Sequence, residues 1–224
     1  MDHTTLRAHV RERAREILDT WFATLDDASE LDREREPFRT CYAHWYGKSA
    51  EVDDRLRARF GGELERVTSA GARWTDELDA WASVPDGLLA LTVLLDQLPR
   101  NIHRGHAQMY AHDALGLHVA TLAIHAYELT PVALVRRMFL YVPLMHVEDR
   151  TVQHAMVARF EELARRAETV SPQNAGFFGY ALGSARRHAD VIDRFGRFPH
   201  RNAILGRAST EAELVYLAEP DAGF

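Results

Sequence analysis

The sequence predicts an all-α protein, and three observations support this fold class. Among the 224 residues, 32 alanines and 25 leucines far outnumber 15 valines and five isoleucines. Unbranched apolar residues favour helices, whereas β-branched residues favour strands. Apolar residues recur at steps of three and four, and no β-branched alternation is long enough for a strand. No break in composition divides the chain, so we expect a single domain over residues 1–224, with about ten helices in antiparallel pairs.

The N-terminal third predicts one long amphipathic helix and two shorter ones. An apolar stripe runs through Leu6–Trp21 with Arg and Glu between its members. Irregular stretches are expected around Asp26–Ser29 and from Pro37 onward. Ser49 is a suitable N-cap for a helix through Phe60, and a further short helix is expected over Gly62–Gly71.

A buried central helix is predicted over Asp86–Leu98. Pro85 suits its first turn, and residues 88–95 are apolar on every side apart from one threonine. Pro99 is expected to end it, because the residue before a proline is disfavoured in helical conformation.

The remaining helices are marked by apolar periodicity and by their caps. Gly196 is a natural C-terminal cap, and Thr210 with Glu213 forms a capping box for the last helix. The expected helices are Asp113–Tyr127, Pro131–Val142, Glu148–Ala167, Asn174–Phe195 and a final one through Leu217.

Charge and composition exclude several classes of function. The chain has 27 basic and 33 acidic residues, a net charge of −6, which disfavours general nucleic-acid binding. The longest apolar runs have eight residues, far short of the 18 or so that a membrane span needs. Charged residues near the N-terminus leave no apolar signal segment, so a cytoplasmic location is expected. Cys41 is the only cysteine, which excludes an intrachain disulfide and a multi-cysteine zinc site.

Two similar corners are the most specific candidates for a functional site. Leu98-Pro-Arg-Asn101 and Phe198-Pro-His-Arg-Asn202 each place a proline beside an apolar helix, followed by arginine and asparagine. One interpretation is structural, because guanidinium and amide groups can satisfy the last carbonyls of a helix. The other is that the corners meet and present Arg100 and Arg201 to one anion.

The local charge around the second corner is compatible with both interpretations. Residues 194–207 contain four arginines and no acid in an otherwise acidic chain. Such a segment either pairs with carboxylates elsewhere in the fold or holds an anion. Asp96 lies in the apolar central helix and should therefore be buried and paired.

The histidines give weaker signals. His188 falls on the apolar face of its helix, where a histidine is more often a satisfied core residue than a catalyst. His146 and Glu148 have a His-x-Glu spacing that is too common to indicate a metal site. We therefore expect no metal and no other cofactor.

Three stretches together resemble a known bacterial family. They are residues 94–105, residues 137–153 around Arg137-Met-Phe-Leu-Tyr-Val-Pro143, and the long motif of residues 194–210. In this order and spacing they resemble the family described as domain of unknown function 924, from about residue 17 to residue 217. The resemblance implies an all-α fold similar to a tetratricopeptide superhelix. It implies no reaction.

The sequence therefore predicts one polar cluster and leaves three functions open. The first is a binding module for an anionic small molecule or a peptide end. The second is an enzyme that uses His188 or His200 as acid or base, with Arg100, Arg137 and Arg201 stabilising negative charge. The third is a structural or interaction protein with every charge internally paired, and the oligomeric state is open in each case. The candidate ligand-binding residues are Asp96, Arg100, Asn101, Arg137, His146, Glu148, His188, Arg197, His200, Arg201 and Asn202.

Overall fold

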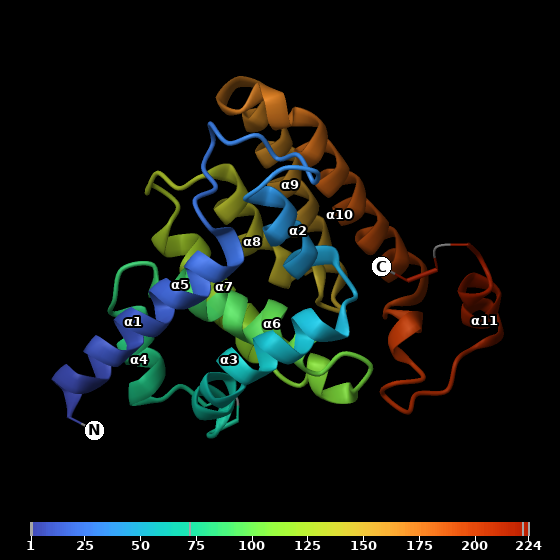
Figure 1. The fold of residues 1–224 in the computed structure, drawn as a ribbon. Coiled ribbons are helices and arrows are strands. Elements are labelled where there is room, and N and C mark those ends of the chain that lie inside the picture. Colours follow the sequence, from blue (N-terminus) through green and yellow to red (C-terminus); the bar gives the residue numbers. More distant parts are fainter. Residues whose placement is uncertain (1, 72, 221, 224) are drawn as a thin grey trace.

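The computed structural model describes residues 2–71, 73–220 and 222–223, and every regular element within them is helical (Figure 1). The first elements in chain order are α1 (His3–Phe22), α2 (Phe38–Tyr46), α3 (Ala50–Thr68), α4 (Asp76–Ala82), α5 (Gly87–Thr92), the π-helix η1 (Val93–Gln97) and α6 (Leu98–Ile102). The all-α prediction is confirmed.

The second half contains the two longest helices. Its elements are η2 (Ala107–Tyr110), α7 (Asp113–Ala126), α8 (Leu134–Met145), α9 (Arg150–Val170), η3 (Pro172–Asn174), α10 (Ala175–Phe195), η4 (Pro199–Arg201) and α11 (Glu211–Leu217). The short turn η3 joins α9 to α10, which lie side by side along their length (Figure 1).

One apolar core holds most of these helices together. The central helix α5 packs against α1, α7 and α8, as its apolar sequence predicts. Contacts of α1 with α5 and of α3 with α6 join elements that are not neighbours in the chain. A repeat stack, by contrast, has contacts mainly between adjacent units. A small second cluster around Phe198 and Tyr216 attaches the segment beyond α10 (Figure 1).

The structure adds helices where an irregular segment was expected. Helix α2 begins directly after Pro37, and its aromatic residues pack on the core; the indole Nε1 of Trp45 donates a hydrogen bond to the Trp21 carbonyl at 2.9 Å. Helix α4 was also not predicted. Helix α3 is continuous through Gly61 and Gly62, because buried side chains on both sides of the glycines offset their low helix propensity of about 1 kcal/mol each.

The prediction that Pro99 ends the central helix is wrong, because a π-helical turn precedes the proline. In η1 the Leu98 N–H donates to the Val93 carbonyl, and Pro99 then occupies the first turn of α6, where a missing N–H costs little. The Arg100 guanidinium donates to the carbonyl of Asp96. Asp96 and Arg100, four residues apart, thus lie on the same face of this continuous helical segment.

Helix boundaries differ elsewhere by a few residues. Helix α8 begins at Leu134 rather than Pro131 and contains Pro143, while α9 begins after the N-cap Asp149. The predicted capping box of Thr210 and Glu213 is present.

Candidate functional site

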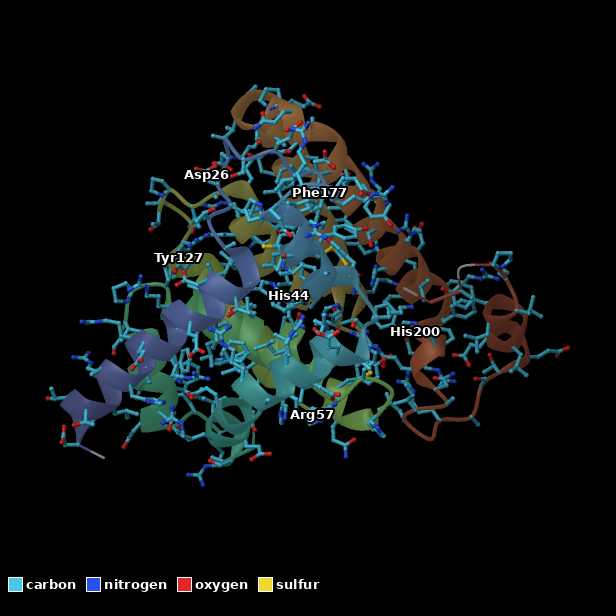
Figure 2. The ribbon with its side chains drawn as sticks, viewed as in Figure 1. Asp26, His44, Arg57, Tyr127, Phe177 and His200 are labelled. Atoms are coloured by element: carbon cyan, nitrogen blue, oxygen red, sulfur yellow. The ribbon has the colours of Figure 1, made fainter. Side chains whose placement is uncertain are left out.

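A cavity of about 730 Å³ lies among η1, α6, α8, α10 and η4. His200 lies where the C-terminal segment meets the helical body (Figure 2). The cavity is thus formed by residues from distant parts of the chain. Its polar residues are Tyr46, Lys48, Gln97, Arg100, Arg104, Tyr110, His146, Tyr180, Ser184, Arg187, His188, His200 and Arg201.

The lining is strongly cationic although the chain is acidic. Five lysine or arginine side chains face this space, and none of its described lining residues is an aspartate or glutamate. The carboxylates that neutralise part of this charge lie behind the arginines. Asp53 binds Arg104 through both oxygens at 2.6 and 3.0 Å, and Asp113 binds Arg100 at 3.0 Å.

Arg201 has the most constrained guanidinium in the cavity. Its Nη1 approaches the second oxygen of Asp113 at 3.3 Å, and its guanidinium carbon lies 4.6 Å from the ring centres of both Tyr110 and Phe198. The residue is only 7% exposed, and burial lowers the pKa of a group that nevertheless stays charged. Its Nε is buried and has no hydrogen-bond partner among the described residues. Arg201 thus places a largely buried, charged guanidinium at the cavity, with one donor that the described residues leave unused.

Asp96 and His146 form a buried hydrogen-bonded pair. The Nδ1 of His146 lies 2.7 Å from Oδ1 of Asp96. Burial opposes ionisation of Asp96, but the charge of Arg100 and the hydrogen bond from His146 hold the pKa of this carboxyl well below its usual range. An ionised carboxylate only accepts, so Nδ1 carries the proton and Nε2 is left as a base.

The histidines of the cavity are held neutral near pH 7. Burial, followed by the charge of Arg100, lowers the pKa of His146. Burial also lowers the pKa of His188 well below its usual value, while its Nδ1 donates to the Ser184 carbonyl at 2.8 Å. Burial and the neighbouring Arg201 lower the pKa of His200 to about 4. The positive charge of the cavity therefore comes from its arginines and Lys48.

One part of the cavity lining, called the apolar wall below, comes mainly from α8. Helix α8 contributes a face of residues spaced by three or four positions, and α9 and α10 add one residue each. This wall consists of Met138, Phe139, Val142, Met145, Phe160 and Ala181.

Arg137 and Asn101 do not join the predicted cluster. The Arg137 guanidinium donates to the carbonyls of Tyr127 and Thr130 beyond the end of α7, at 3.1 and 2.9 Å. The amide of Asn101 donates to Asp53 and to the His44 carbonyl. Both side chains satisfy oxygen acceptors at helix ends, so a shared site with Arg201 is incorrect for them.

Arg197, Asn202 and Glu148 belong to a separate ion-pair network. Arg197 binds Glu213 through two nitrogens at 2.6 and 2.7 Å, and Asn202 donates to the same carboxylate. Glu148 accepts two hydrogen bonds from Arg207 and one from the Phe198 N–H. These residues hold the segment that positions Arg201, but they do not line the cavity. Of the predicted residues, the cavity brings together Arg100, His146, His188, His200 and Arg201, with Asp96 behind them.

Several residues of the site were not predicted. In the sequence, Asp113 is recognisable only as an acidic residue at the start of a helix. No sequence pattern marks Tyr110 as a site residue. Lys48 is the only lysine of the chain, and it follows the aromatic cluster that ends at Tyr46. These two features together could have marked Lys48 as a candidate site residue. Arg104 and Arg187 look like ordinary helix-surface or turn residues in the sequence.

The described residues contain no group of three or more histidine, cysteine or carboxylate side chains placed to hold a metal ion. No helix in the described ranges is long and apolar enough to cross a membrane.

The fold and the cavity define an all-helical protein with an internal basic site. The model of the bacterial family of unknown function DUF924 matches residues 17–221, and the chain belongs to this family. It is also similar to the solved structure of the protein of unknown function ATU0120 from Agrobacterium tumefaciens, at 33% identity and a TM-score of 0.68. That alignment covers 92% of this chain and 97% of the other. Comparison with curated proteins gives no match.

Proposed function

We propose that the cavity binds an anionic small molecule or a peptide carboxylate. The observation that carries this proposal is the lining of five cationic side chains without a carboxylate among its described residues. Placing like charges around a partly desolvated space costs free energy unless a counter-charge occupies it. The guanidinium of Arg201 lines this space and supplies a charge that would attract such a ligand.

Internal pairing accounts for part of the cluster but not all of it. Asp96 and Asp113 pair with Arg100, Asp53 pairs with Arg104, and Asp113 also contacts Arg201. Lys48 and Arg187, in contrast, are exposed side chains of the cavity lining, and Arg187 lies over the Tyr180 ring. Because they are solvated, these two charges need no counter-ion, but they add to the positive potential of the lining.

The test is a thermal-shift and calorimetric titration with phosphate, sulfate, short carboxylates and nucleotides. We expect at least one of these anions to raise the Tm in a saturable way, and we expect chloride at equal ionic strength to have no such effect. Arg201→Gln should lose the shift, whereas Arg186→Gln, at an exposed arginine of α10 paired with Glu161, should keep it. No saturable shift from any anion at millimolar concentration would overturn the proposal.

A second candidate function is acid–base catalysis on the bound anion. The Asp96–His146 pair favours it, since a carboxylate that fixes the imidazole tautomer leaves Nε2 able to accept a proton. Arg100 and Arg201 would stabilise developing negative charge, and His146 takes the role that the sequence suggested for His188 or His200. Screening chromogenic carboxylic and phosphoric esters tests this candidate. Turnover that His146→Asn abolishes, with anion binding intact, would support it, and no turnover of any ester would count against it.

A further inference from the structure

The cavity has two chemically different walls, and the apolar one is not needed to hold an inorganic anion. Met138, Val142 and Met145 lie on one face of α8, and Phe160 of α9 and Ala181 of α10 complete this wall. These side chains are buried or half-buried in the core, yet they face a cavity. Apolar surface beside empty space loses dispersion contacts that a ligand of the same polarity would restore.

The size of the cavity also exceeds that of a head group alone. A volume of about 730 Å³ lies in the range of sites for whole small molecules, roughly 300–1,000 Å³. Phosphate or acetate at Arg201 would occupy the cationic end and leave the wall of α8 uncovered.

The residue types of the apolar part suit a flexible occupant. Three of the five methionines of the chain, Met109, Met138 and Met145, line the cavity. Methionine side chains are unbranched and polarizable, so they adapt to chains or rings of different shape. A cavity for a fixed polar ligand would instead need convergent hydrogen-bonding groups on this side.

We propose that the ligand is an amphipathic anion, with one carboxylate or phosphate head on an apolar chain or ring. The head lies at Arg100, Arg201 and His200, and the apolar body lies along Met138, Val142 and Phe160. This inference rests on the proposed anion binding and adds the class of molecule that is bound.

Calorimetry with a homologous series separates the two proposals. Titration of acetate, butyrate, hexanoate and octanoate should show the Kd falling about fourfold per added methylene until the apolar wall is covered. Octyl phosphate should bind if the site accepts either head, and 1-octanol should bind far more weakly than octanoate. Equal affinity for all four carboxylates would contradict the proposal that the ligand is amphipathic, but it would be consistent with anion binding. Octanol binding as tightly as octanoate, or no binding by any anion, would overturn the proposed function itself.

A substitution in the apolar wall tests the position of the chain. Ala181→Leu adds side-chain volume beside α8, whereas Ala158→Leu makes the same change at an exposed position of α9. We expect Ala181→Leu to weaken octanoate binding at least about tenfold and to leave acetate binding unchanged, and we expect Ala158→Leu to change neither. Circular dichroism and Tm establish that both variants fold. If Ala181→Leu weakened acetate and octanoate binding equally, or weakened neither, this placement of the apolar chain would be contradicted. If Ala181→Leu does not fold, the homologous series on the unmodified protein still tests the proposal.

Discussion

Arg100 and Arg201 share the carboxylate of Asp113, one oxygen for each guanidinium, at 3.0 and 3.3 Å. The two Pro-Arg corners therefore do meet, and an acid of the protein itself lies between their arginines. Asp96 also pairs with Arg100, so two carboxylates match the two guanidinium charges, while Nε of Arg201 has no partner among the described residues. Internal pairing through Asp113 therefore accounts for one part of each guanidinium group, and the proposed anion would bind at another part.

Asp113→Asn should strengthen anion binding while it destabilises the unliganded protein. The substitution removes the internal counter-charge but keeps the shape, so Arg100 and Arg201 repel each other and attract an external anion more strongly. We expect the free energy of unfolding to fall by about 1–3 kcal/mol in chloride, and the anion-induced rise in Tm to exceed that of the parent protein. Urea denaturation with and without phosphate measures both effects. A smaller anion effect in Asp113→Asn would contradict the shared-carboxylate account.

Arg201→Ala should lower stability by about 1–3 kcal/mol, because two aromatic faces lose a stacked cation and a cavity forms. The loss is limited because Asp113 keeps its bond to Arg100. Arg186→Ala is the matched control and should change stability by less than about 1 kcal/mol, since its ion pair is exposed. Denaturant midpoints that are equal for the two variants would show that Arg201 is not structurally engaged.

Stability should fall as pH decreases from about 6.5 to 5, because histidines that are neutral in the fold become protonated on unfolding. The folded pKa of His200 is about 4 against an ordinary value of 6.5, so the unfolded state binds more protons in this window. His200 alone should contribute about 2 kcal/mol of this loss, and the lowered pKa values of His188 and His146 add to it. Urea midpoints at several pH values measure the slope. His200→Gln should give a shallower slope; an unchanged slope would indicate that His200 is solvated and titrates normally.

Glu213→Ala should loosen the segment that carries Arg201. Glu213 is 2% exposed, binds both nitrogens of Arg197, and accepts from the Thr210 N–H at 2.7 Å. Its removal leaves buried donors unpaired and should cost about 2–4 kcal/mol. Glu211→Ala, at an exposed acid two residues earlier in α11, should cost less than about 1 kcal/mol. Hydrogen exchange over residues 197–217 checks this; protection equal to that of the parent protein would contradict it.

Local patterns in the sequence were sufficient for the fold class and most long helices. The stripe of α1, the apolar α5 and the capping box of α11 each depend on neighbouring residues, so each was predictable. The prediction for Pro99 was wrong because the helix continues through a π-helical turn, in which the Leu98 N–H bonds to the Val93 carbonyl. No local sequence pattern marks such a turn.

The site was only partly predictable because its pairs connect distant segments. The burial of Asp96 follows from its apolar helix, but its partner His146 depends on how α8 packs against η1. Arg137 was misassigned because an arginine that caps a neighbouring helix has the same sequence context as one that faces a cavity. Asp113 was missed because an acid at a helix start is ordinarily explained by the helix dipole.

The most direct test of anion binding is a crystal structure of the protein grown with octanoate or phosphate. The account predicts an oxyanion with one oxygen about 3 Å from a guanidinium nitrogen of Arg100 or Arg201 and, for octanoate, a chain along Met138 and Val142. Density for water alone at Arg201, in crystals saturated with either anion, would contradict it.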